Sequence, residues 1–389
     1  MKTHLQLLKF KNIMQSWKHL KRGDTHLLSL PMELQLEVTN LCNLSCVMCF
    51  RKFAERFEQG TMPSELLEKM TTILPLVTVA HLFGGGEPLT NPSFLSFISM
   101  MNKHNIGLEF NSNGTLLNTE TSTQMVDCGV KAIVFSIDGA TAKTYESIRI
   151  GANFERVIGN IRTLNEIKKH KNKKLPHLLF STVAMKSNIH DLPLLVQLAS
   201  NLGVEAIHVL KLSAPFSYGK QYELFYKSQV VDEAPSQDII QSVNEAMHIS
   251  QNLGIQLECY IDAERSRSYN NFKPPYRVVL HNLLRNFLSD DFMLSNDMCS
   301  QPWTSIVADW NGNIRPCCYS SFVLGNLKDD ELEKIWNGDR YIRLRRSFIE
   351  GQRLPECISC MSARQNKHAF HHITDHFSTS EMLLSNVIV

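Results

Sequence analysis

Residues 41–50 read LCNLSCVMCF, and this stretch decides how the rest of the sequence is interpreted. Its cysteines, Cys42, Cys46 and Cys49, are separated by three residues and then by two. Three thiolates from one tight loop suit three irons of a cubane and leave the fourth iron open, whereas a fully ligated electron-transfer cluster uses a fourth cysteine. Zinc is the main alternative, although structural zinc normally takes four ligands and no further His or Cys follows closely. A group of cysteines that binds no metal is the remaining alternative.

The composition is that of an ordinary globular protein, with 43% apolar and 20% charged residues and a formal net charge of +2 over 389 residues. A net charge this small does not indicate a basic surface that would bind nucleic acid. The sequence has no 18-residue apolar run and no continuous signal-peptide core, so we expect a cytoplasmic protein without a membrane partner. Because disulfides are rare in a reducing compartment, the ten cysteines indicate metal ligation or catalysis.

Short strand-like runs alternate with helical patterns from residue 33 onward. The pattern predicts strands over Glu33–Val38, Thr78–Phe83, Gly107–Asn111, Ala132–Ile137, His177–Ala184 and Ala206–Leu210, with helices near 64–74, 92–104, 119–128, 154–169 and 191–202. Strands that alternate with helices form a parallel sheet with right-handed crossovers, so we predict an α/β fold that curls toward a barrel or partial barrel.

Polar motifs follow the predicted strands at their carboxyl ends. GGGEP (84–88) and NSNG (111–114) follow the second and third strands, SIDG (136–139) ends the fourth, and Asn188 lies just beyond the fifth. Since reacting groups of such folds sit on these loops, all of them should meet the cysteine triplet at one edge of the sheet.

The chain divides into five predicted parts. Residues 1–30 form a helical extension, 31–215 the α/β core, 216–298 a helical linker with helices around 236–253 and 276–289, 299–361 a small metal-organised domain, and 362–389 a tail. Arg343, Arg345 and Arg346 lie on a probable helix of the small domain, where solvent exposure is the favoured interpretation.

CxxxCxxC after the first strand and GGEP after the second resemble the radical S-adenosylmethionine (SAM) superfamily. The resemblance extends through NSNG, SIDG and IRIGANFERVIGNI (148–161) and covers about residues 33–212. It implies a partial (β/α)6 barrel and a [4Fe–4S] cluster held by Cys42, Cys46 and Cys49. In this family the open iron chelates the methionine part of SAM, and reductive cleavage gives a 5′-deoxyadenosyl radical that takes a hydrogen atom from the substrate.

The resemblance also implies which residues contact SAM. Glycines of the GGGEP motif would let the backbone approach the methionine part, and Glu87 would accept from its ammonium, with a helix N-cap or a surface carboxylate as alternatives. Phe50 would lie beside adenine or pack in the core, and Arg149 would meet the SAM carboxylate or form a surface ion pair. The complete expected set is Phe50, Gly85, Gly86, Glu87, Asn113, Ser136, Arg149, Asn188 and Leu210.

A second group of cysteines lies near the C-terminus. Cys299, Cys317, Cys357 and Cys360 supply four thiolates, the full complement for one [4Fe–4S] cluster, and the spacing alone fits zinc equally well. CSQPW (299–303), LGNL (324–327), IWNG (335–338) and the final CxxC resemble the SPASM/Twitch auxiliary-cluster domains in their one-cluster form. A fully ligated cluster implies electron exchange rather than substrate binding. For Cys318 there are three alternatives: it replaces Cys317 as a ligand, it stays unligated, or it gives a hydrogen atom to a substrate radical.

These features predict an enzyme that cleaves SAM reductively and oxidises or epimerises a sugar, aminocyclitol or other small polar metabolite. The alternative is modification of a ribosomal peptide by crosslinking, thioether formation or epimerisation, although the first 30 residues are few for a leader-peptide-binding domain. A non-catalytic zinc or iron–sulfur scaffold is a distant alternative. Flavodoxin or ferredoxin is the expected electron donor.

Overall fold

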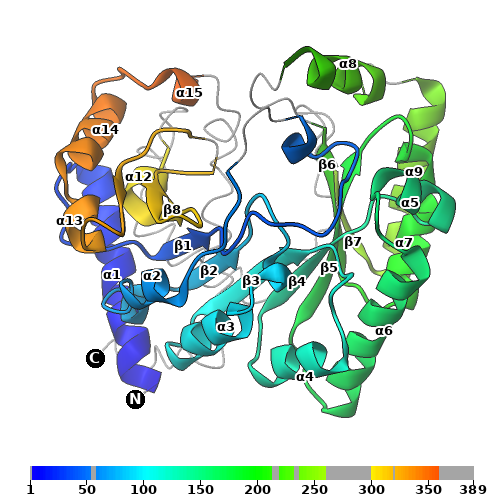
Figure 1. Cartoon of the computed structure of the whole chain (residues 1–389), viewed down its shortest axis with the longest axis horizontal. Helices are drawn as coiled ribbons and strands as arrows, with labels where there is room; N and C mark the ends of the chain where they lie inside the picture. The colour runs from blue at the N-terminus through cyan, green and yellow to red at the C-terminus, as the bar shows by residue number, and fades with distance from the viewer. Residues whose placement is uncertain are drawn as a thin grey trace.

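A computed structural model of the chain describes residues 2–53, 58–212, 219–231, 236–259, 299–318 and 320–358. These residues build a ten-stranded sheet. Its strands are β1 (Glu33–Leu36), β2 (Val79–Leu82), β3 (Gly107–Ser112), β4 (Ala132–Ser136), β5 (His177–Ala184), β6 (Ala206–Lys211), β7 (Gln256–Cys259), β8 (Ser305–Ala308), β9 (Asn313–Arg315) and β10 (Gly325–Asn326). The strand order is β10–β9–β8–β1–β2–β3–β4–β5–β6–β7 (Figure 1).

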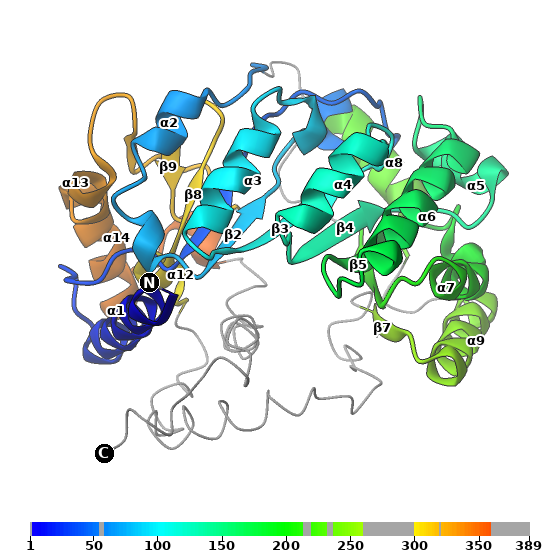
Figure 2. The ribbon, with the colours of Figure 1, turned by 90° about the horizontal axis from the view of Figure 1, so that it is seen from below.

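Strands β1 to β6 lie side by side in chain order, and each neighbouring pair is parallel. This confirms the predicted α/β fold with a partial (β/α)6 barrel. The connecting helices are α2 (Ser64–Glu68), α3 (Phe94–Lys103), α4 (Thr119–Asp127), α5 (Ala142–Ile148), α6 (Phe154–His170) and α7 (Leu192–Asn201). Figure 2 shows the sheet curving, with α3, α4 and α6 on its outer side. The pattern-based expectation omitted α5, which spans only seven residues.

On β1 and β3 buried and part-buried residues alternate, so that apolar and polar side chains lie on opposite faces of the sheet. Apolar residues of these strands, such as Leu34 and Phe110, belong to the main core, and polar ones occupy the inner face. There His81 Nε2 lies 3.1 Å from Glu33 Oε1, and His81 Nδ1 lies 3.5 Å from Glu109 Oε2. The inner face at β1, β2 and β3 is therefore hydrophilic.

The sheet extends beyond the predicted core on both sides. Part of the predicted linker forms α9 (Gln237–Leu253) and then β7, which pairs in parallel with β6; the helix expected around 276–289 lies outside the described residues. On the other side β8 pairs in parallel with β1, Glu33 lying opposite Ser305. Since β8 belongs to the predicted small domain, that domain shares its sheet with the core.

The ends of the described chain pack against this sheet. Helix α1 (Lys2–Arg22) is anchored by Lys9 Nζ, which donates to the carbonyls of His104 at 2.9 Å and Asn105 at 2.6 Å. The small domain adds α12 (Gln301–Thr304), α13 (Leu332–Trp336), α14 (Asp339–Ile349) and α15 (Pro355–Ile358). Among the helices described, none is long and apolar enough to cross a membrane.

The expected exposure of Arg345 is wrong. This side chain is fully buried, with its guanidinium carbon over the rings of Trp336 and Tyr341, at 4.5 and 4.8 Å from their centroids. It is held there by hydrogen bonds to the carbonyls of Pro302 and Thr25.

Candidate active site

The cysteine triplet lies in the loop after β1, at the carboxyl edge of the sheet. Backbone hydrogen bonds from Ser45 N to Ile150 O (3.0 Å) and from Val47 N to Ile148 O (2.9 Å) attach this loop to the segment after α5. A turn bond of 3.1 Å from Cys49 N to Cys46 O brings the last two cysteines together. The loop is thus fixed on both sides of its central cysteine.

The three thiols share one electrostatic environment. Burial raises the pKa of Cys46 to about 11, Arg149 lowers it, and Cys49 and Cys42 raise it further. Arg149 Nη1 lies 3.8 Å from Cys46 Sγ, and Asn113 Nδ2 lies 3.9 Å from Cys42 Sγ. Thiols that raise one another's pKa are near neighbours, and a bound metal would supply the positive charge that makes them thiolates. This donor set fits a cluster held by three thiolates.

The GGGEP loop lies directly on the cysteine loop. Glu87 N donates to Leu41 O at 2.7 Å, and a Cβ at Gly86 would lie 2.3 Å from the same carbonyl oxygen. Only glycine allows this approach. Two loops that the sequence separates by about forty residues therefore form one surface beside the cysteines.

The Glu87 carboxyl is 2% exposed and turns toward β3. It accepts from Asn113 N at 2.7 Å, from Ser112 Oγ at 2.9 Å and from Leu89 N at 3.4 Å, the last contact being the helix N-cap weighed as an alternative. Burial raises its pKa to about 7, against the lowering effect of these donors. A carboxylate has about four acceptor positions, so about one remains for a ligand.

Arg149 forms a buried ion pair with Asp138, so the surface ion pair considered as an alternative is wrong. Its Nε donates to Asp138 Oδ2 at 2.6 Å, and Asp138 also accepts from Val183 N at 2.7 Å. Asn188 completes this corner by donating to the carbonyls of Asp138 and Val183, both at 3.0 Å. Asp138 was not selected from the sequence, although it is the third residue of SIDG, whose position at a strand end was the available signal.

The other expected SAM contacts are spread along the same edge. Ser136 is the last residue of β4, and Asn113 links β3 to the cysteine loop through a 2.9 Å bond to Asn43 Oδ1. Phe50 is half-buried and begins a short 3-10 helix over Phe50–Lys52, while Leu210 of β6 is 40% exposed. The structure therefore brings all the expected residues to one edge of the sheet, as predicted from the strand order.

The C-terminal cysteines lie in the small domain, next to or within its short helices and strands. Cys299 precedes α12, Cys317 follows β9 and Cys357 lies in α15; all three are half-buried, whereas Cys318 is exposed. Cys360 lies outside the described residues. Two buried donors of α14, Tyr341 Oη and Arg345 Nη2, have no hydrogen-bond partner among the described residues. Cys317 contributes to the raised pKa of Tyr341, after burial and against Arg345, so the two side chains are close. The Tyr341 hydroxyl, a buried donor close to a thiol, fits a cluster whose sulfurs accept hydrogen bonds.

Two family models match the chain. The radical SAM superfamily model matches residues 36–196, and the SPASM model, an iron–sulfur cluster-binding domain, matches residues 299–361. The first match contains the cysteine and GGGEP loops, and the second contains the four C-terminal cysteines. Both sets of thiols therefore belong to iron–sulfur domains, which removes the zinc alternatives.

The curated relatives of this chain have low sequence identity to it. A tungsten-containing aldehyde ferredoxin oxidoreductase cofactor-modifying protein of Pyrococcus furiosus is 26% identical over 351 residues, which is 84% of this chain and 86% of that protein. Mycofactocin maturase MftC of Mycobacterium ulcerans is 28% identical over 140 residues, only 36% of this chain and 38% of that protein.

Among solved structures, SuiB of Streptococcus suis bound to the precursor peptide SuiA superposes with a TM-score of 0.60. The two sequences are 19% identical, and the match covers 87% of this chain and 71% of SuiB. This likeness establishes a shared fold.

Proposed function

Because this chain belongs to the radical SAM superfamily and carries a SPASM iron–sulfur domain, we propose that it modifies a peptide by hydrogen abstraction. The observation that most directly supports SAM chemistry at this site is the contact of the GGGEP loop with the cysteine loop, through Glu87 N and Leu41 O at 2.7 Å. When bound, the cluster and SAM supply the 5′-deoxyadenosyl radical that removes the hydrogen atom.

The residues of the chain orient SAM and stabilise its cluster. Cys42, Cys46 and Cys49 hold the N-terminal [4Fe–4S] cluster, and Arg149 places a positive charge beside it. Gly85 and Gly86 leave the backbone open to the methionine part, and the remaining acceptor position of Glu87 receives its amino group. The remaining parts of SAM would be contacted by Phe50, Asn113, Ser136, Asn188 and Leu210.

The second cluster takes Cys299, Cys317, Cys357 and Cys360 as its ligands. Cys317 suits ligation better than Cys318, because it is half-buried and close to the Tyr341 hydroxyl, whereas Cys318 is exposed. An exposed thiol at this place is available to give a hydrogen atom to a substrate radical.

The comparisons favour a peptide over the sugar or aminocyclitol that was first predicted. SuiB, which shares the fold, was solved with a precursor peptide. A cofactor or its precursor is the second candidate, because the Pyrococcus furiosus relative matches along most of both chains.

Anaerobic reconstitution tests the proposal. The enzyme should hold about eight irons, and dithionite, reduced flavodoxin or reduced ferredoxin should drive release of 5′-deoxyadenosine from SAM. Short peptides encoded beside the gene should accelerate this release and change mass. Loss of two mass units would indicate oxidation, and uptake of deuterium from solvent would indicate epimerisation. Absence of SAM cleavage would overturn the proposal, and acceleration by cofactor precursors alone would favour the second candidate.

A further inference from the structure

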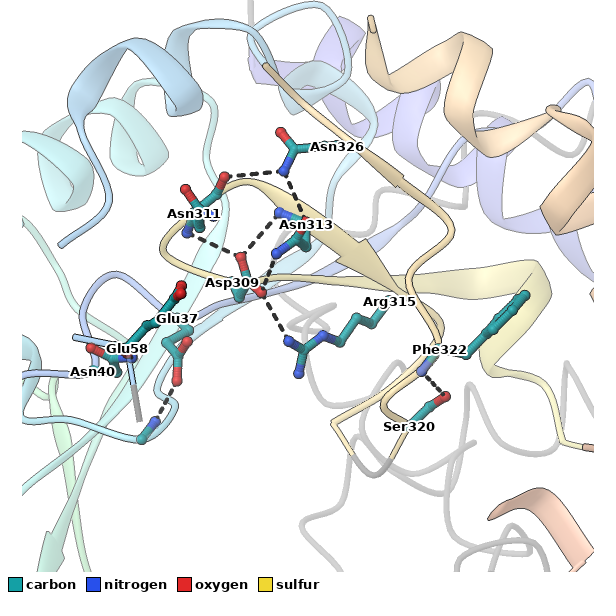
Figure 3. A network of polar contacts seen from close by, with 11 residues as sticks. Glu37, Asn40, Glu58, Asp309, Asn311, Asn313, Arg315, Ser320, Phe322 and Asn326 are labelled. Carbon is teal, nitrogen blue, oxygen red and sulfur yellow. Dashed lines mark hydrogen bonds and ion pairs between the residues drawn. The ribbon is translucent and has the colours of Figure 1, made fainter. Parts of the chain in front are cut away.

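Glu37, directly after β1, is a charged residue of the inner face that the SAM contacts above leave unexplained. Its Oε1 accepts a hydrogen bond of 2.7 Å from the main-chain N–H of Gly85 (Figure 3). The preceding glycine lies against the same side chain, since a Cβ at Gly84 would be 2.4 Å from Glu37 Cγ. The GGGEP loop therefore lies on the Glu37 side chain as well as on the cysteine loop.

The same residue contacts the SPASM domain. Its main-chain N–H donates to Ala308 O, the end of β8, at 2.9 Å. The turn that follows β8 is held by Asp309, which accepts from Asn311 N, Asn313 N and Arg315 Nη2, each at 3.0 Å (Figure 3). A carboxylate with this many donors makes the turn Asp309–Gly312 a rigid partner.

A second contact joins this turn to the cysteine loop. The Trp310 ring covers Gly60, where an added Cβ would lie 2.0 Å from Cε3 of the indole. Gly60 is in turn paired with Asn40, through bonds of 2.7 Å from Gly60 N to Asn40 Oδ1 and 3.1 Å from Asn40 N to Gly60 O. Asn40 lies two residues before Cys42, so one turn of the SPASM domain supports both loops.

The charges around Glu37 are consistent with such a contact. Burial is the largest effect on this carboxyl and raises its pKa, as the nearby charge of Asp309 also does. The main-chain N–H groups of Gly85 and Trp310 and the positive charge of Arg315 lower the pKa. Donors from the SAM loop and from the SPASM turn thus act on the same carboxylate.

We propose that Glu37 is a positioning residue for SAM, which fixes the Gly84–Gly86 loop in its binding conformation and ties it to the SPASM turn Asp309–Gly312. The inference rests on the proposed function, in that it takes the GGGEP loop as the SAM site. A glycine-rich loop has the largest conformational entropy to lose. Holding it before SAM arrives reduces that cost at the moment of binding.

Substitutions of Glu37 test this role by SAM binding to the reconstituted enzyme. Glu37→Ala removes the acceptor for Gly85 N–H, and we expect the Kd for SAM to rise about tenfold, as loss of one hydrogen bond to a charged group predicts. The KM for SAM should rise in parallel, with kcat at saturating SAM and the iron content nearly unchanged. Glu37→Gln retains an acceptor oxygen and should bind SAM within about threefold of wild type. Glu33→Gln is the matched control, because it also removes one carboxylate charge, four residues earlier in the chain, and Glu33 contacts His81 instead of the glycine loop.

Hydrogen exchange of residues 83–88 gives a readout that needs no SAM. Exchange of this segment should accelerate in Glu37→Ala and stay at the wild-type rate in Glu33→Gln. Unchanged exchange together with unchanged SAM affinity in Glu37→Ala would overturn the inference while wild-type SAM cleavage stands. Equal loss of N-terminal iron in the Ala and Gln variants would also overturn it, because it would indicate a general structural role. A wild-type enzyme that does not bind SAM would instead refute the proposed function.

Discussion

Replacing Arg345 with alanine should remove the SPASM cluster and leave the N-terminal cluster in place. The guanidinium donates to the carbonyls of Pro302 and Thr25, both at 2.9 Å, and lies 4.5 Å from the Trp336 ring centroid. Burial lowers its pKa only to about 10, so it is charged at neutral pH. Two hydrogen bonds from a charged group at about 1.5 kcal/mol each, with about 1 kcal/mol from ring stacking, amount to about 4 kcal/mol.

A loss of about 4 kcal/mol is a large part of the stability of an ordinary domain. The lost contacts connect α14 with the segment that carries Cys299, which lies three residues before Pro302. Helix α14 itself lies beside Cys317. Iron per chain should therefore drop from about eight to about four, and SAM should still alter the electron paramagnetic resonance spectrum of the remaining cluster. Arg346→Ala changes the exposed neighbour on the same helix and should keep both clusters. An Arg345→Ala enzyme with wild-type iron and wild-type melting temperature would refute the reasoning.

Three further predictions concern the two clusters and their surroundings. Replacing Cys42, Cys46 and Cys49 together with alanine should leave about four irons and abolish release of 5′-deoxyadenosine; cleavage by this variant would exclude the assigned SAM cluster. Tyr341→Phe removes a buried hydroxyl that has no partner among the described residues, so the melting temperature should stay unchanged. Redox titration should show a lower potential for the SPASM cluster, by about 59 mV if one-electron reduction becomes tenfold less favourable. An unchanged potential would mean that the hydroxyl does not reach the cluster. Burial raises the pKa of Glu87 to about 7 from 4.5, so the stabilisation by its protonated form is complete below pH 4.5 and lost as pH rises through 7. Between pH 5.5 and 8, wild type should lose about 2 kcal/mol relative to Glu87→Gln in chemical denaturation of the cluster-free chain, and equal slopes in the two proteins would contradict the shift.

The sequence predicts the central strands well because their signal is local. His177–Ala184 is an apolar run with a period of two, and the structure gives β5 the same bounds. Strand β8 carries no comparable signal, since Ser305–Ala308 is four residues long and buried throughout. Its identity as a strand depends on pairing with β1, which lies far away in the sequence. A local pattern contains no information about such a partner.

The same distinction applies to the site. Cysteine spacing and the glycine motif identify the loops, because the chemistry requires those residue types at those positions. Arg345 was misplaced because its partner Thr25 lies 320 residues away, yet a signal was present. Tyr341, Leu344 and Phe348 form the buried face of α14, and Arg345 lies on that face by helical spacing. Its position relative to these neighbours was more informative than its charge.

The position of β8 also bears on how the roles of the two domains can be separated. Because β8 pairs with β1, the backbone of Glu37 is bonded to Ala308, and the turn after β8 lies against the loops that carry the glycine motif and the cysteines. Deleting the SPASM domain would therefore expose the β1 edge and free the Gly84–Gly86 loop, in addition to removing a cluster. A truncated enzyme that fails to cleave SAM would not show that the second cluster is needed for cleavage. Point substitutions at the ligands, such as Cys317→Ala, leave the shared sheet intact and separate electron transfer from SAM binding.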